Sequence, residues 1–253
     1  MKAAGRRDKG GSPRGSGEPR GTALRQLLEE LPLFGDLLRG LHWLARLPAR
    51  QSRPFPGTGE FWEQRYGRGG TSGAGSYGAA ASLKARVLND FVREEGVPSV
   101  IEFGCGDGNQ LRLARYSSYL GFDVSPSALR RCREDFRDDS TKSFKLMDEY
   151  AGEEAELALS LDVVYHLVEE KLFSGYMERL FSAGERFVVI YSSNTESNFG
   201  FRGTHVRHRL FTKWVEEHAR DWRLKKKVPG WSFFRGALPF RYGVAFYIYE
   251  RSP

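Results

Sequence analysis

A glycine-rich turn behind a short apolar strand is the feature that most limits how this chain can fold. The segment 100–111 reads VIEFGCGDGNQL, so glycine recurs at every second position, at Gly104, Gly106 and Gly108. Glycine tolerates a positive φ angle and lets a ligand approach the backbone, and the helix expected after the turn presents free N–H groups. The pattern predicts a strand, a ligand-binding turn and a helix.

Short apolar segments alternate with helical patterns from Pro98 onward. The predicted strands are Ser99–Phe103, Tyr119–Val124, Phe144–Met147, Leu157–Leu161, Phe187–Tyr191, Arg223–Val228 and Val244–Tyr249. We expect a helix after each of the first five. Such alternation gives right-handed crossovers and a mostly parallel sheet with helices on both faces, so the predicted fold class is α/β.

Two acidic residues strengthen the prediction of a ligand site. Glu102 lies just before the turn, and Asp123 ends the second strand, 19 residues after Gly104. At this spacing a carboxylate meets the hydroxyls of a ribose. A nicotinamide-dependent dehydrogenase shares these features, but it uses Gly-x-Gly-x-x-Gly to bring a helix N-terminus to a pyrophosphate. Glycine at every second position, with Glu102 and Asp107 nearby, favours a cationic ligand instead.

At these residues the chain resembles the class I S-adenosylmethionine-dependent methyltransferases. Their first motif, an acid followed by x-Gly-x-Gly-x-Gly, is met in full by residues 102–108. The resemblance covers roughly 60–253 and is strongest over 98–195. It implies a Rossmann-like methyltransferase fold, with a mostly parallel seven-stranded sheet, and S-adenosylmethionine as the cofactor.

The resemblance also implies a set of cofactor-binding residues. Gly104 and Gly106 would lie under the methionine and ribose portions, Asp123 would bind both ribose hydroxyls, and Asp148 would meet the adenine amino group. The full set is Tyr66, Glu102, Gly104, Cys105, Gly106, Asp107, Asp123, Val124, Asp148 and Leu161.

The segment after the fourth strand, ALSLDVVYHLVEE at 158–170, faces the transferred methyl group in the resembling family. Asp162 and His166 are four residues apart, so a helix that begins at Asp162 would place both on one face. His166 is then a candidate general base for an acceptor hydroxyl, and the alternative is a hydrogen-bonded structural histidine. Some related O-methyltransferases bind a metal here, but Tyr165 replaces a carboxylate, so we expect no metal.

A long polar connection at 191–215 carries His205, Arg207, His208 and Arg209. Long loops at the ligand edge of a sheet are usually functional. We expect His205 or His208 to act as base and an arginine to bind an anionic group; the alternative is a solvated basic surface. A zinc site at His205-x-x-His208 lacks further ligands.

A glycine-rich loop at Gly69–Ser76 precedes a helix predicted over Tyr77–Glu95. This fold commonly places a lid over the cofactor here. Trp62, Tyr66 and Tyr77 are candidates to close on the adenosine or the sulfonium by aromatic and cation–π contacts.

The net charge of +7 is unevenly distributed along the 253 residues. Residues 1–53 hold 11 of the 39 Lys and Arg and 5 of the 32 Asp and Glu, which is +6; the remaining 28 and 27 give +1. We predict a disordered basic tail at 1–21, an amphipathic helical leader and Pro/Gly linker at 22–59, and a methyltransferase domain at 60–253. The leader either packs on the domain or lies on a membrane surface through residues 22–50.

The two cysteines cannot form a disulfide framework, and no stretch is long and apolar enough to span a membrane. We therefore expect a cytoplasmic protein, with membrane association left open.

The predicted function is methyl transfer to a small-molecule or carbohydrate acceptor, including a glycolipid, most often at oxygen. The alternatives are a nucleic-acid (RNA) methyltransferase that uses the basic tail and Lys225–Lys227, and a non-catalytic cofactor-binding accessory protein. A nearly neutral domain argues against nucleic acid. The sequence leaves the oligomeric state open.

Overall fold

The structure is a computed structural model, and it describes residues 55–198, 204–230 and 243–252. The chain divides into two compact units, 1–53 and 54–253, and all described residues belong to the second. The predicted basic tail and amphipathic leader therefore lie outside the described residues. No helix in the described part of the chain is long and apolar enough to cross a membrane.

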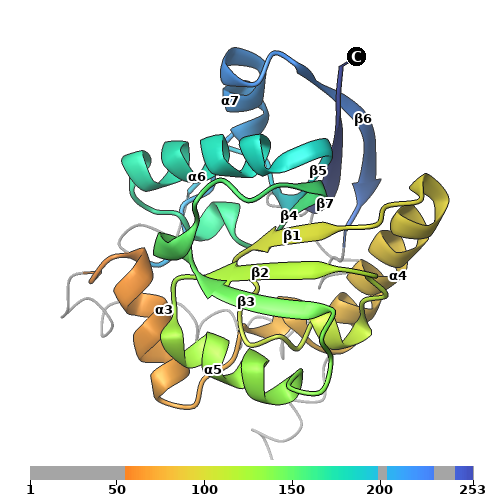
Figure 1. The fold of residues 1–253 in the computed structure, drawn as a ribbon. Helices are drawn as coiled ribbons and strands as arrows, with labels where there is room; N and C mark the ends of the chain where they lie inside the picture. Colours follow the sequence, from red (N-terminus) through yellow and green to blue (C-terminus); the bar gives the residue numbers. More distant parts are fainter. Residues whose placement is uncertain (1–54, 199–203, 231–242, 253) are drawn as a thin grey trace, which may run out of the picture. The chain divides into compact units, whose positions relative to one another are not determined.

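The second unit is built on a seven-stranded sheet in the order β3-β2-β1-β4-β5-β7-β6 (Figure 1). The strands are β1 (Val100–Phe103), β2 (Tyr119–Asp123), β3 (Lys142–Leu146), β4 (Ala155–Leu161), β5 (Gly184–Ser193), β6 (Trp222–Pro229) and β7 (Val244–Arg251). The first five run parallel, and β7 is antiparallel to both of its neighbours, β5 and β6. The predicted α/β class and mostly parallel seven-stranded sheet are thus confirmed.

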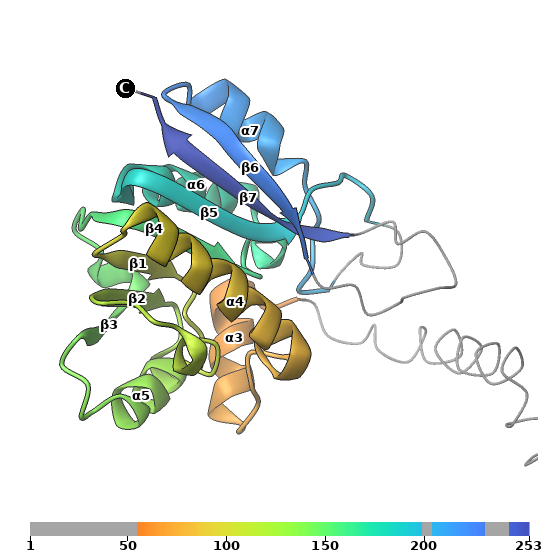
Figure 2. The same cartoon turned by 90° about the vertical axis from the view of Figure 1, so that its right-hand side faces the viewer.

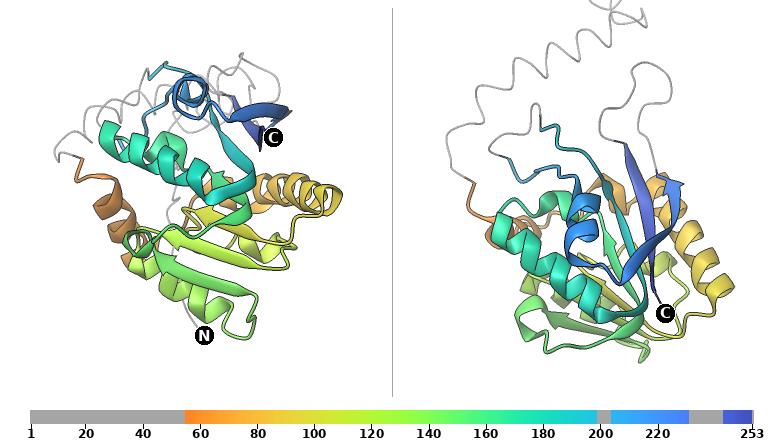
Figure 3. Two further views of the ribbon diagram at one scale, coloured as in Figure 1. Left: turned by 45° about the horizontal axis from the view of Figure 1, so that its top comes forward. Right: turned by 90° about the horizontal axis from the view of Figure 1, so that it is seen from above.

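Helices cover both faces of this sheet (Figures 1 and 3). On one face α4 (Gly78–Glu95) and α5 (Pro126–Asp135) pack on the sheet, and on the other α6 (Glu170–Ala183) and α7 (Phe211–His218). Alternate residues of the central strands feed the two cores: Leu157 and Leu159 join the α4 side, while Ala158 joins the α6 side. This period of two is what a strand covered on both faces requires.

Helix α3 (Thr58–Gly67) lies beside α5 (Figure 2). It begins inside the stretch that the sequence predicted as a linker. The Glu63 carboxylate of α3 accepts hydrogen bonds from the Ser125 and Ser127 hydroxyls at the start of α5. At its own first turn, Thr58 donates through its backbone N–H and its hydroxyl to the Glu169 carboxylate just before α6. Helix α3 is therefore joined to two other helices.

The expectation of a helix after each of the first five strands is wrong at two places. β1 and β3 are followed only by short 3-10 turns, Leu111–Leu113 and Met147–Glu149. After β1 the turn buries Leu111 and leaves Leu113 42% exposed, so its apolar surface is too short to support a helix. After β3 the chain is acidic and turns at Gly152, where φ is +100°.

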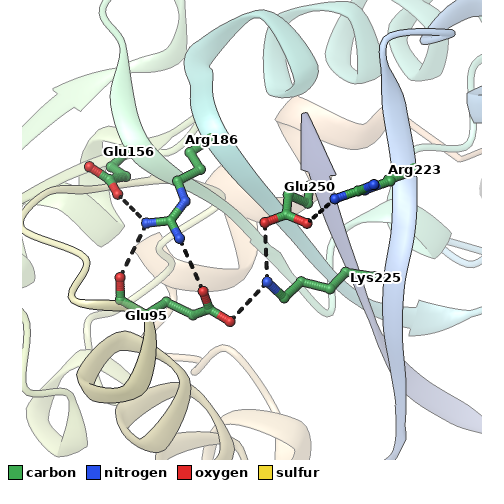
Figure 4. A network of polar contacts seen from close by, with 6 residues as sticks. All are labelled: Glu95, Glu156, Arg186, Arg223, Lys225 and Glu250. Atoms are coloured by element: carbon green, nitrogen blue, oxygen red, sulfur yellow. Dashed lines mark hydrogen bonds and ion pairs between the residues drawn. The ribbon is translucent and has the colours of Figure 1, made fainter. Parts of the chain in front are cut away.

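A network of charged side chains joins the antiparallel strands to the parallel part of the sheet (Figure 4). Arg186 on β5 contacts Glu95 and Glu156, at 3.2 and 3.0 Å. Lys225 on β6 contacts Glu95 and Glu250, at 3.0 and 3.1 Å. Arg186 and Glu156 lie near the starts of their strands, so the network stabilises the sheet edge opposite the glycine turn.

Candidate functional site

A cavity lies where β1, β2 and β4 end, at the edge where open α/β sheets bind ligands. Its volume is about 100 Å³, and it opens to solvent. Thr58, Trp62 and Tyr66 of α3 line one side of the cavity.

The glycine turn forms the floor of this cavity. Gly104 and Gly106 have φ angles of +87° and +60°, which side-chain-bearing residues rarely adopt. A Cβ at Gly104 would collide with Val163, and one at Gly106 would collide with the Ser72 hydroxyl and approach the Tyr66 hydroxyl to 2.9 Å. Both positions therefore require glycine, because protein side chains fill the space that a Cβ would take.

Asp123, at the end of β2, faces the cavity with a buried carboxylate. Its two oxygens accept hydrogen bonds from the backbone N–H groups of Gly106 and Ser125, each at 2.9 Å. Burial raises the pKa of this carboxyl to about 6, against the effect of those hydrogen bonds. Each oxygen retains a lone pair for a ligand, which is the arrangement that a vicinal diol requires.

Glu102 is the second buried carboxylate of the cavity. Its Oε2 accepts a hydrogen bond of 2.6 Å from the Tyr119 hydroxyl. Burial raises the pKa of Glu102 to about 7, although this hydrogen bond and Lys84 oppose the increase. The carboxyl is thus half protonated near neutral pH, and a cationic ligand would favour its ionised form.

Replacing Glu102 by glutamine should stabilise the ligand-free protein at high pH. An acid whose pKa is raised on folding keeps its proton in the native state, so wild-type stability falls as pH rises from about 4.5 to 7. Glutamine does not ionise, so the variant keeps the free energy of unfolding that wild type loses. The difference is roughly 3 kcal/mol, or several degrees in Tm. Thermal unfolding should show a gain that is near zero at pH 4.5 and largest above pH 8. An equal gain at both pH values would contradict the raised pKa.

Asp107 has a different place from the one that the resemblance implies. It does not line the cavity; its carboxylate accepts hydrogen bonds from the Ser72 N–H and hydroxyl, at 2.9 and 2.7 Å, and from the Tyr77 hydroxyl at 2.9 Å. Asp107 therefore holds the glycine-rich loop 69–76 against the turn. Arg131 joins this loop to α3 by donating to the carbonyl oxygens of Gly70 in the loop and Tyr66 in the helix.

Eight of the ten predicted cofactor residues line the cavity. They are Tyr66, Glu102, Gly104, Cys105, Gly106, Asp123, Val124 and Leu161. Asp107 and Asp148 do not, and Met147 lines the cavity beside Asp148. Of the predicted lid aromatics, Trp62 and Tyr66 line it and Tyr77 does not.

The turn after β4 differs from the expected helix start. Asp162 has a φ of +61° and the 3-10 turn begins at Val164, so no helix begins at Asp162. Its carboxylate accepts from Lys84 Nζ at 2.7 Å and from the Tyr165 hydroxyl at 2.8 Å. Among non-glycine residues, Asp tolerates this left-handed backbone better than most, and an outlier held in this way often marks a functional turn.

Of the three candidate histidines, only His166 lines the cavity. Its Nδ1 lies 2.9 Å from the carbonyl oxygen of His205. Because a carbonyl only accepts, Nδ1 carries the proton and Nε2 carries the lone pair of the neutral ring. Burial lowers the pKa of His166 to about 4, so the ring is neutral at physiological pH.

The other two histidines do not line the cavity. The His205 ring stacks between His166 and Phe61, with centroids 5.2 and 4.3 Å away. His208 is buried, its Nδ1 lies 2.7 Å from the Ser193 hydroxyl, and burial lowers its pKa. Their arrangement favours supporting roles, with His205 holding the tautomer of His166.

The arginines expected to bind an anionic acceptor contact the protein instead. Arg207 and Arg209 donate to the backbone carbonyl of Val168, Arg209 also donates to that of Leu167, and both pair with Glu170. These contacts join the 204–210 segment to the start of α6. Among the described residues no group of three or more His, Cys, Asp or Glu side chains is placed to hold a metal ion.

Lys84 and Gln110 are among the cavity residues that sequence reasoning missed. The sequence does carry a signal for Lys84. It lies on the same face of α4 as Leu88 and Phe91, where a charged residue would be buried. Gln110 follows the glycine turn and carried no comparable signal.

The comparisons with known proteins agree with this geometry. Residues 101–189 match a family model described as a methyltransferase domain. No curated protein matches the chain. The N-methyltransferase NodS from Bradyrhizobium japonicum WM9, in complex with S-adenosyl-L-homocysteine, is similar in structure, with a TM-score of 0.59 at 13% identity over 77% of this chain and 98% of that one.

Two further solved structures share the fold. An S-adenosylmethionine-dependent methyltransferase from Clostridium acetobutylicum ATCC 824 has a TM-score of 0.53 at 10% identity, covering 67% of this chain and 91% of that one. Magnesium protoporphyrin IX methyltransferase from Synechocystis PCC 6803 has a TM-score of 0.52 at 15% identity, covering 67% and 82%. Residues 101–189 thus match a methyltransferase domain, and the fold that carries them is shared with S-adenosylmethionine-dependent methyltransferases.

Proposed function

We propose that this enzyme transfers a methyl group from S-adenosylmethionine to a hydroxyl oxygen of a small or carbohydrate-like acceptor. The observation that carries the proposal is His166, which lines the cavity at the end of β4 with its Nε2 as a hydrogen-bond acceptor. Asp123 would bind the ribose hydroxyls, and the turn at Gly104 and Gly106 would support the methionine side.

The cofactor, when bound, supplies an electrophilic methyl group on a sulfonium. The protein then has two tasks, to align the acceptor and to receive its proton. His166 Nε2 accepts the hydrogen of the acceptor hydroxyl and thereby orients the oxygen. Transfer would form the O–C bond as the methyl–sulfur bond breaks, which would make the acceptor oxygen positive and its proton strongly acidic. A base with a pKa of about 4 is sufficient to take that proton.

The test is methyl transfer by the purified full chain to a panel of sugars, phenols, carboxylic acids, amines and a short RNA. We expect turnover with a hydroxyl acceptor. His166→Ala should lower kcat by about 100-fold, the lower end of the range for a positioned base, and should leave the Kd for S-adenosylhomocysteine nearly unchanged. His208→Ala is the matched control, because His208 does not line the cavity. Turnover with amines alone, or an unchanged kcat in His166→Ala, would overturn the assignment to oxygen.

The alternative function, methylation of nucleic acid, has less support. In the basic run at the sheet edge, Lys225 pairs with Glu95 and Glu250, and Lys227 lies 4.9 Å from the Tyr247 ring centroid. These cations are partly engaged within the protein. The acceptor panel decides the matter, since salt-sensitive methylation of the RNA would replace the small-molecule proposal.

A further inference from the structure

Tyr165 packs against the ring of His166 without lining the cavity. The two ring centroids are 4.5 Å apart, and the rings are tilted by 59°. His166 lines the cavity, whereas Tyr165 does not. His205 stacks on the His166 ring at 5.2 Å and Trp62 meets it in a T-shaped contact at 4.9 Å. Aromatic rings therefore enclose the proposed base on several sides, and Tyr165 is the neighbour that a ligand does not meet.

Tyr165 is fixed at both of its ends. Its hydroxyl donates to Asp162 Oδ1 at 2.8 Å, and its backbone carbonyl accepts from the N–H of Arg207 at 2.8 Å. Burial and the Asp162 charge raise the pKa of the phenol well above its usual value, so the hydroxyl keeps its proton and is the donor to this carboxylate. A charge-assisted hydrogen bond thus holds the far end of the ring that packs on His166.

Asp162 is in turn held by a buried cation. Lys84 Nζ lies 2.7 Å from Asp162 Oδ2, and the Lys84 side chain has no exposed surface. The Asp162 N–H donates to the carbonyl oxygen of Tyr191 at 2.9 Å. A buried ion pair resists separation, because either ion left alone would be buried without a partner. Contacts therefore run without a gap from Lys84 on α4 through Asp162 and Tyr165 to the His166 ring.

We propose that Tyr165 is a positioning residue: it holds the His166 imidazole in the direction and the tautomer that present Nε2 to the acceptor, with Asp162 as its anchor. The effect on turnover rests on the proposed function, since it takes His166 as the base. The orientation of the ring does not depend on that function. A ring that rotates or exchanges tautomers aligns the acceptor only part of the time, and small misplacements lower a rate strongly.

The first measurement is NMR of the full chain with isotope-labelled histidine, because the shifts of the ring nitrogens report which of them carries the proton. The signals of His166 are those lost in His166→Ala. Tyr165→Phe keeps the ring and removes the hydroxyl that Asp162 holds, so we expect the His166 signals to move from a single tautomer toward a mixture. Tyr77→Phe is the matched control: it removes a tyrosine–aspartate hydrogen bond of 2.9 Å elsewhere and should leave the His166 signals as in wild type.

The second measurement is turnover with the hydroxyl acceptor that the panel identifies. Tyr165→Phe should lower kcat about 10-fold, less than the loss expected for His166→Ala, and should leave the Kd for S-adenosylhomocysteine nearly unchanged. Asp162→Asn removes the charge that holds the hydroxyl. In that background Tyr165→Phe should lower kcat by no more than about twofold further, because the two substitutions act on one hydrogen bond.

His166 signals that do not move in Tyr165→Phe would overturn the inference. Equal losses in kcat and in cofactor affinity would overturn it as well, since Tyr165 would then only maintain the fold. A full further loss of kcat in the Asp162→Asn background would show that the hydroxyl acts without its anchor, which contradicts the proposal. If the His166 signals move as expected but His166→Ala keeps its kcat, the ring is held as inferred and the proposed function fails instead.

Discussion

Gly106→Ala should abolish cofactor binding at ordinary concentrations, with an increase in Kd of about 1,000-fold. The backbone at this position has a φ of +60°, which costs an alanine roughly 1–3 kcal/mol. The new Cβ would also collide with the Ser72 hydroxyl and press on that of Tyr66, which adds a similar cost. The loop 69–76 and the turn have to separate, so the floor of the site is deformed. Titration with S-adenosylhomocysteine measures the loss.

Gly108→Ala is the matched control for this variant. Gly108 belongs to the same turn and has a φ of +76°, but its Cβ would meet Phe136 at 3.0 Å and Cys132 at 3.1 Å, and it does not line the cavity. We expect a lower Tm with a Kd near that of wild type for the folded protein. Equal losses of affinity in both variants would mean that the turn responds as a whole, and that contact at Gly106 is not decisive.

Asp123→Ala should weaken cofactor binding nearly as much, by about 1,000-fold. A carboxylate that accepts from both hydroxyls of a ribose makes two charge-assisted hydrogen bonds, each contributing roughly 1.5–3 kcal/mol. The alanine also frees the N–H groups of Gly106 and Ser125, which Asp123 now satisfies. Asp123→Asn keeps an oxygen for one of them and should lose only about 30-fold, the effect of weaker neutral bonds.

A comparison of ligands separates the two contributions of Asp123. S-adenosylhomocysteine and its 2′,3′-dideoxy form should differ strongly in affinity for the wild type and very little for Asp123→Ala. If the alanine variant still distinguishes them by a large factor, another group binds the ribose. Circular dichroism of both variants checks that the turn remains folded.

The parts of the fold that the sequence predicts well are those set by local chemistry. The alternation of apolar segments identified all seven strands, and the glycine turn with Asp123 identified the ligand edge. The helices expected after β1 and β3 are absent, because those segments lack an apolar stripe and the crossover is made by turns. Helical spacing of apolar residues predicts a helix only where the apolar face of that helix has a surface to pack against.

Within the site, the sequence could not predict roles that depend on contacts between segments far apart in the chain. Asp107 has the right spacing for a ligand residue, yet Ser72 and Tyr77 occupy its carboxylate. Arg209 suggests an anion site, yet the carbonyls of Leu167 and Val168 take its donors. Whether a charged residue remains available to a ligand is decided here by partners 30 or more positions away.

The attachment of α3 bears on how fast product leaves the site. This helix lines the cavity through Thr58, Trp62 and Tyr66, and it is held by Glu169 at one end and by the start of α5 along its length. If spent cofactor leaves past α3, several of these bonds have to break together, and such openings take microseconds to milliseconds or longer. Product residence time, and with it inhibition by the enzyme's own product, would then depend on Glu63 and Glu169, which do not line the cavity.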